Sequence, residues 1–307
     1  MTREAKGWWL GLLGVGIFAL TLPMTRLAVG PAEAPQLPPL FVTAGRAVVA
    51  ALCSITYLLW VRAARPAGDQ WRALALCGAG TAIGFPLCLA LALRDVPAGH
   101  AAVITGVLPL GTAVAAALLM HQRPAAGFWA CAALGCALVL AYAAWRGGGA
   151  WQAADGWLLL SVVSTSIGYV YGARLATQMP AQQVVSWALV LALPVTLPLA
   201  LLSRPALPGA VLATAWMGFA YVSLFSMWIG FFAWYRGLAL GGTLRVSQVQ
   251  LVQPFLSLLF AVPLLGERLD AATVLFALAV IATVFLGKRM PSGAPPASST
   301  SPSPSSP

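Results

Sequence analysis

The chain has 307 residues, of which 60% are hydrophobic and only 8% are charged, and its mean hydropathy is +0.88. A soluble domain carries about 25% charged residues, so this composition excludes a soluble globule. The net charge of +10 does not indicate nucleic-acid binding, because the basic residues stand singly between apolar stretches rather than on one basic face.

About ten apolar stretches of roughly 20 residues follow one another along the chain, and a helix needs about 20 apolar residues to cross a bilayer core. Backbone hydrogen bonds must close within each span, and the short alternating strands of a barrel are absent from the sequence. We therefore predict an all-α polytopic membrane protein with ten transmembrane helices. The predicted spans are 7–29, 39–62, 73–93, 98–120, 124–145, 156–177, 182–203, 210–235, 243–265 and 270–287.

Both ends of the chain are polar. Residues 1–6 are predicted to form a short N-terminal tail, and the apolar run after it is longer than the roughly 7–15 residues of a signal peptide, so we interpret it as an uncleaved first span. Residues 291–307 are rich in Pro and Ser. Such a segment cannot bury enough apolar surface to fold, so we predict a disordered tail.

The basic residues between the spans predict the orientation, because Lys and Arg accumulate on the cytoplasmic side. A cytoplasmic N-terminus places the larger set inside: Arg3, Lys6, Arg62, Arg65, Arg72, Arg123, Arg174, Arg236, Arg245, Lys288 and Arg289. The smaller set then lies outside: Arg26, Arg94, Arg146, Arg204 and Arg268. We expect an integral protein of the cytoplasmic (plasma) membrane with both termini in the cytoplasm.

Two segments resemble each other at an offset of 145 residues. Ala90 to Arg123 matches Tyr235 to Arg268, with Pro109 on Pro254 and His100 on Arg245. The repeat unit holds five spans, an odd number, so two tandem units must enter the membrane in opposite directions. We predict inverted repeats over residues 7–146 and 147–290; the alternative is that apolar helices resemble one another by chance.

These segments resemble the EamA branch of the drug/metabolite transporter superfamily over residues 8–288. The resemblance is carried by the Pro109 helix ending in Gln122-Arg123, by the span from Arg245 to Leu269 with Gln253-Pro254 and the closing Leu265-Gly266-Glu267-Arg268-Leu269, and by Arg46. The family's Gly-Glu at the end of the fourth span is His121-Gln122 here, so no acid has a role at that place. The resemblance implies two inverted five-helix units that transport small metabolites, often as efflux of amino acids or related compounds.

Arg46 is a candidate substrate-binding residue because it lies about two turns inside the second span. An ionised Arg within a span costs roughly 2.5–3.5 kcal/mol on insertion scales and should face protein, water or a partner. One interpretation is a counter-charge for a substrate carboxylate. The other is an Arg that extends to the outer interface.

The ninth span carries Gln250, Gln253 and Pro254 on one helical face. Amides are expensive in lipid, so this face should be interior. The two glutamines either bind a polar substrate or join helices, at under about 2 kcal/mol per contact. Pro109 and Pro254 predict kinks near the middle of their spans.

Aromatic and hydroxyl side chains complete the predicted site. Tyr169, Tyr221 and Trp228 lie deep in the sixth and eighth spans, where aromatic walls suit apolar or aromatic solutes. Thr21 and Thr25 of the first span are further candidates.

No H-E-x-x-H motif and no phosphate-binding loop occurs, so we expect no catalytic residues, metal, cofactor or ATP motor. The predicted function is a secondary transporter that moves small metabolites by alternating access, with the small-molecule substrate and the lipid bilayer as its partners. The alternatives are a non-transporting membrane scaffold and an intramembrane lipid-modifying enzyme. The sequence leaves the oligomeric state open.

The topology is testable by cysteine labelling in a background without the five native cysteines. We expect Arg146→Cys to react with a membrane-impermeant reagent in intact cells, and Arg65→Cys only after permeabilisation. Labelling of Arg146→Cys from the cytoplasmic side alone would contradict the predicted orientation.

Overall fold

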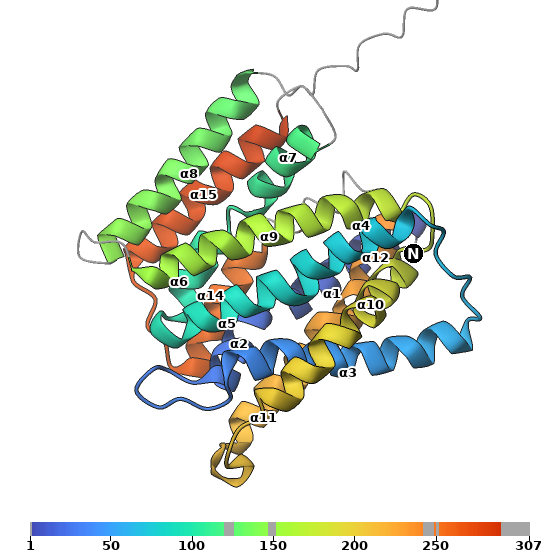
Figure 1. Ribbon diagram of the computed structural model, residues 1–307. Coiled ribbons are helices and arrows are strands. Elements are labelled where there is room, and N and C mark those ends of the chain that lie inside the picture. The colour runs from blue at the N-terminus through green and yellow to red at the C-terminus, as the bar shows by residue number, and fades with distance from the viewer. Residues whose placement is uncertain (1, 120–125, 147–151, 242–248, 250–251, 290–307) are drawn as a thin grey trace, which may run out of the picture.

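The computed structural model describes residues 2–119, 126–146, 152–241, 249 and 252–289. The regular elements in these ranges are helices, and no strand occurs among them (Figure 1). Seven helical stretches, some of which join two or three of these elements, are long and apolar enough to cross a membrane, and three shorter apolar helices lie at 129–142, 253–265 and 271–283. The protein is therefore an all-α polytopic membrane protein, as predicted.

The helices coincide with the predicted spans to within a few residues, although part of the ninth span and the C-terminal tail lie outside the described residues. Spans one to five contain α1 (Arg3–Ala19), α2 (Thr21–Val29), α3 (Pro39–Trp60), α4 (Gln70–Gly78), η1 (Ala79–Gly84), α5 (Phe85–Asp95), α6 (Ala98–Thr105), α7 (Leu108–Leu119) and α8 (Ala126–Arg146). Spans six to ten contain α9 (Ala153–Leu175), α10 (Ala181–Leu202), α11 (Ala213–Tyr221), η3 (Val222–Ile229), α12 (Gly230–Gly241), α14 (Gln253–Leu265) and α15 (Ala271–Arg289), and the 3-10 turn η2 (Pro208–Ala210) precedes α11.

The packing of these helices joins the first half of the chain to the second. The first span packs on the eighth, as α1 on α12 and α2 on α11, and the third packs on the sixth, as α4 and α5 on α9. Adding the offset of 145 residues to the first span gives the sixth, and adding it to the third gives the eighth, so the two pairs of spans are equivalent. Two further pairs, α3 with α10 and α8 with α15, join spans that are each other's counterparts (Figure 1).

Breaks in helical geometry also recur at matched places. The third and eighth spans both contain a π-helix, η1 at 79–84 and η3 at 222–229, and the offset carries the first range onto 224–229. In the fourth span α6 ends at Thr105 and α7 starts at Leu108, while α14 of the ninth span starts at Gln253, again 145 residues later. These coincidences favour the predicted repeat, whose inversion stays a prediction.

The prolines lie where the helices restart. Pro109 and Pro254 are each the second residue of a helix, so the kinks predicted inside continuous helices take the form of fresh helix starts. The first turn of a helix has backbone N–H groups without intrahelical partners, so a proline there removes no hydrogen bond.

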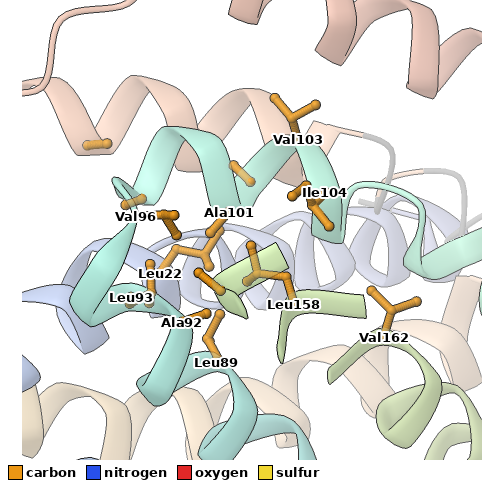
Figure 2. Close-up of a cluster of buried hydrophobic side chains, with 14 of the residues drawn as sticks. Leu22, Leu89, Ala92, Leu93, Val96, Ala101, Val103, Ile104, Leu158 and Val162 are labelled. Carbon is orange, nitrogen blue, oxygen red and sulfur yellow. The ribbon is translucent and has the colours of Figure 1, made fainter. Parts of the chain in front are cut away.

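A large apolar cluster fixes the helices around these breaks. It includes Leu22 of α2, Leu89 and Leu93 of α5, Ile104 of α6 and Leu158 of α9, all buried (Figure 2). Lipid is as apolar as these side chains, so their association depends on close van der Waals contact rather than on the hydrophobic effect.

Glycines provide the closest contacts between helices. A Cβ atom on Gly237 of α12 would lie 2.6 Å from the backbone nitrogen of Gly11 and 3.0 Å from the carbonyl oxygen of Gly7, both on α1. In the matching pair of spans, a Cβ on Gly80 of η1 would lie 2.4 Å from the Ser164 carbonyl oxygen of α9. Only a residue without a side chain allows these backbones to approach so closely.

Gly237→Ala should therefore separate α1 from α12, because the atoms it meets are backbone atoms that cannot rotate away. We expect a loss of about 1–3 kcal/mol, measured as a lower melting temperature in detergent. Gly16→Ala on α1 is the control, since a Cβ there meets nothing within 4 Å. An equal effect of both substitutions would contradict the close-contact explanation.

Candidate functional site

A cavity lies where the breaks of the two halves meet. It has room of about 70 Å³ for the centres of water-sized spheres. One water needs about 10–15 Å³ on this measure, so several waters or a solute the size of an amino acid fit inside. The lining residues are Phe18, Thr21, Leu22, Arg46, Thr81, Phe85, Ala102, Thr105, Gly106, Leu108, Thr165, Tyr169, Ser226, Met227, Phe231, Gln253, Pro254, Ser257 and Ile281.

The turn between α6 and α7 contacts the first turn of α14 beside this cavity. Gly106 lies in the turn between α6 and α7, and a Cβ atom on it would lie 3.4 Å from Cγ of Pro254 in the first turn of α14. Thr105, Leu108 and Gln253 flank these positions and also line the cavity. Interrupted helices expose backbone groups without intrahelical partners, which are tolerated at membrane depth only where protein or a polar cavity surrounds them.

Some of the residues predicted for the site line the cavity. Arg46, Thr21, Tyr169 and Gln253 do so, from four different spans, and Pro254 lies beside them. The structure thus brings together residues that are up to 232 positions apart, as Thr21 and Gln253 are. Their role in binding stays a proposal.

Other predicted residues are placed elsewhere. Thr25 is buried within the protein away from the cavity lining. The Tyr221 hydroxyl donates to the Ile17 carbonyl oxygen at 3.0 Å, and the Tyr221 ring stacks on Phe225. Trp228 packs against Phe232. Gln250 lies outside the described residues, as do the side chain of Pro109 and residues 121–123 and 245.

Arg46 lies at one end of a short chain of polar contacts that runs through Ser226 to Thr21. Its side chain is 3% exposed, so it does not extend to the surface as an interfacial Arg would. Its Nη2 donates to the Ser226 hydroxyl of η3 at 3.0 Å, and Ser226 in turn contacts the Thr21 hydroxyl at 2.7 Å. Its Nε atom is buried without a hydrogen-bond partner in the described part of the chain.

Several lining residues were not predicted from the sequence. Ser226 and Thr165 provide hydroxyls, while Phe18 and Phe231 pack edge to face beside the cavity at a ring-centre distance of 5.0 Å. Single serines, threonines and phenylalanines are common in membrane helices, so their types carry no signal. The one available signal is the offset of 145, which carries Thr81 onto Ser226 and so places a hydroxyl at equivalent positions of both π-helices.

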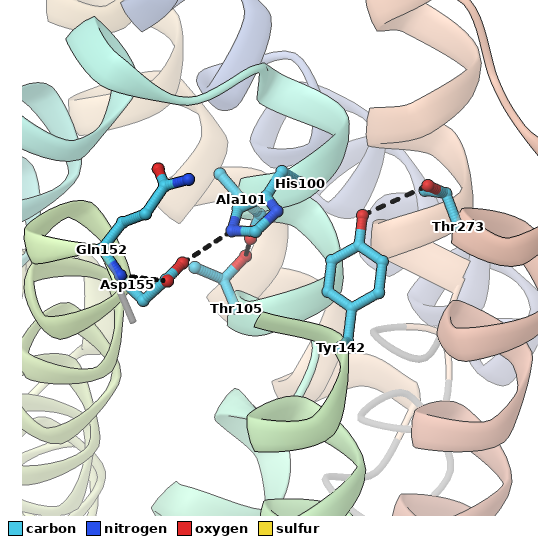
Figure 3. A network of polar contacts seen from close by, with 7 residues as sticks. All are labelled: His100, Ala101, Thr105, Tyr142, Gln152, Asp155 and Thr273. Atoms are coloured by element: carbon cyan, nitrogen blue, oxygen red, sulfur yellow. Dashed lines mark hydrogen bonds and ion pairs between the residues drawn. The ribbon is translucent and has the colours of Figure 1, made fainter. Parts of the chain in front are cut away.

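Two carboxylates hold the start of α6 in place. Glu267 accepts hydrogen bonds from the backbone nitrogens of Ala98 and Gly99 at 2.6 and 2.8 Å, so a residue from the second half caps a helix of the first. His100 Nε2 lies 2.7 Å from Asp155 Oδ1 on α9, and both side chains are buried (Figure 3). These contacts fix α6, whose other end lines the cavity.

The comparison with known families agrees with this architecture. The profile of the EamA-like transporter family matches residues 5–143 and again residues 152–287. The chain therefore belongs to the EamA-like transporter family, within the drug/metabolite transporter superfamily, and is a membrane transporter.

Individual relatives extend this assignment. Over 289 residues the chain is 43% identical to a Bacillus subtilis (strain 168) protein named "Uncharacterized transporter YdeK", covering 94% of this chain and 99% of the relative. A crystal structure described only as that of a protein matches with a TM-score of 0.62 at 19% identity, covering 94% of this chain and 99% of the other. The second likeness shows the fold alone.

The contact between Ser226 and Arg46 is testable by Ser226→Ala. This substitution removes the hydrogen-bond partner of the Arg46 Nη2 atom, and leaving a buried polar group unpaired costs about 1–3 kcal/mol. We expect a lower melting temperature in detergent. Ser54→Ala is the matched control, because Ser54 lies on the same helix as Arg46, is fully buried and has no hydrogen-bond partner in the described part of the chain.

Proposed function

We propose that this protein is a secondary transporter that exports small metabolites across the cytoplasmic membrane by alternating access. Membership of the EamA-like transporter family and the name of the Bacillus subtilis relative support transport in general. The observation that supports this cavity as the substrate site is that it borders both the break between α6 and α7 in the fourth span and the start of α14 in the ninth. Transporters built from inverted repeats bind their substrates at such interrupted helices.

The symmetry of the packing supports alternating access. In the proposed cycle the repeats, residues 7–146 and 147–290, exchange conformations and open the cavity to each side in turn. The matched π-helices η1 and η3 are suited to this, because both adjoin the cavity and π-helical turns depart from the regular α-helical hydrogen-bond pattern. The cavity suits solutes about the size of an amino acid, so amino acids and related compounds are the first to test.

An enzymatic role receives less support from the same geometry. Among the described residues that line the cavity, Arg46 is the only one with an acidic or basic side chain, and Tyr169 is the only tyrosine. General acid–base catalysis needs a positioned group that exchanges a proton near the working pH, and an Arg side chain does not. The wall of hydroxyls and phenylalanines is better suited to binding a solute than to reacting with it.

The proposed site is testable through Thr165→Val, measured as exchange of radiolabelled solutes in proteoliposomes. The Thr165 hydroxyl lines the cavity and has no hydrogen-bond partner in the described part of the chain. Its loss should therefore leave the melting temperature unchanged or raised, since valine has nearly the same shape. If the hydroxyl binds substrate, KM should rise about threefold to tenfold, the value of one hydrogen bond.

Thr196→Val on α10 provides the matched control. Its hydroxyl is also buried without a partner in the described residues, but it does not line the cavity. Both substitutions should behave alike in stability, and only Thr165→Val should alter KM. Unchanged transport by a well-folded Thr165→Val protein would remove Thr165 from the site, and absence of saturable exchange across a broad metabolite panel would defeat the proposed function.

A further inference from the structure

Arg46 is a buried cation with no anionic partner in the described part of the chain. The guanidinium group contacts the neutral Ser226 hydroxyl, and no carboxylate lies within ion-pairing distance of it in the described part of the chain. The sequence has seven acidic residues, and each lies in a loop or in the terminal turn of a helix. The segments outside the described residues contain no Asp or Glu in the sequence.

The remaining cavity wall is neutral. Besides Arg46, the lining includes several hydroxyl groups, among them the unpartnered hydroxyl of Thr165. The rest of the wall is largely apolar, with side chains such as Phe18, Phe85 and Met227. A solute bound here meets one positive charge, several hydroxyls and an apolar surface. The arrangement suits a molecule with one charged end and an apolar body.

The charge of the solute decides how well it fits, because charge in a low-dielectric interior is costly unless it is paired. A monoanion neutralises Arg46 and leaves an uncharged complex. A zwitterion adds an ammonium group that finds no acidic side chain on the wall, and the complex keeps a net positive charge. A cation places two like charges in one cavity, and a dianion leaves an unpaired negative charge.

A carboxylate matches the planar guanidinium group of Arg46 better than most other monoanions of similar size. Arg46 lines the cavity, and a guanidinium group presents its N–H groups as a planar fork that a carboxylate accepts through both oxygens. We propose that the transported solute is a small monocarboxylate with an apolar body and no ammonium group, held by Arg46. This inference rests on the proposed transport function and names its substrate class.

Three solutes with the same branched hydrocarbon body test the charge directly: isocaproate, leucine and isoamylamine. They carry a carboxylate alone, a carboxylate with an ammonium, and an ammonium alone. Binding to the purified wild-type protein is measured by thermal shift, and exchange is measured in proteoliposomes. We expect isocaproate to bind and exchange with an affinity about tenfold or more above that of leucine, and isoamylamine to give no saturable signal.

Two substitutions separate the role of Arg46 from general damage. Arg46→Gln removes the charge and should abolish the preference for isocaproate over leucine. Arg46→Lys keeps the charge but loses the planar fork, and should preserve the order of the three solutes with a severalfold weaker affinity for isocaproate. The wild-type measurements need neither variant, so the inference remains testable even if both variants fail to fold.

The outcomes distinguish this inference from the function on which it rests. Saturable exchange of leucine or isoamylamine at equal or higher affinity than isocaproate overturns the monocarboxylate class and leaves the transporter standing. Isocaproate that is neither bound nor exchanged also overturns the class. Loss of exchange for these solutes and for a wide metabolite panel overturns the proposed function itself.

Discussion

The absence of hydrogen-bond partners in the hydrocarbon core is the constraint on which this structure depends. Each backbone N–H and C=O must be satisfied within the protein, so every described membrane segment is a helix. A departure from helical geometry is acceptable only where protein or a polar cavity surrounds it. The turn at Gly106 and the helix start at Gln253 both border the cavity, which is where such departures are tolerated.

Close contact replaces the hydrophobic effect as the force that holds these helices together. Gly237 against α1 and Gly80 against α9 let backbones approach to distances that any side chain would prevent. These two contacts connect opposite halves of the chain, as does the cap that Glu267 forms on α6. The halves are therefore interleaved rather than stacked, and the cavity between them has walls from both.

The sequence was sufficient to predict the spans, because about 20 apolar residues between polar joints admit few other interpretations. It also located Arg46, since a charge inside a span is rare and has few uses. The offset between Pro109 and Pro254 marked the places where helices restart. The breaks themselves were not predicted, because a proline in the first turn of a helix and a proline inside one look alike in a sequence.

Which side of each helix faces the cavity was harder to predict from the sequence than how deep a residue lies in the membrane. Tyr221 and Trp228 are seven residues apart, a spacing that shares one face in an α-helix. The structure shows that Trp228 lies in the π-helix η3, which starts directly after Tyr221, has more residues per turn and so rotates the face that meets the cavity. Ser226 and Met227 consequently line the cavity, while Trp228 packs on Phe232. A rare local geometry that leaves no compositional trace decided this part of the site.

Arg46 is difficult to explain by stability alone. An apolar residue at this position of α3 would insert into the membrane more favourably, and replacing buried charges by well-packed apolar groups is often neutral or stabilising. Its hydrogen-bond partner in the structure is one serine hydroxyl, and its Nε has none in the described residues. A cation kept at such a cost, in the wall of a cavity and without an anion of its own, is suited to binding an anion that enters and leaves. The same isolation that makes Arg46 a poor structural element suits it to the binding role that we propose.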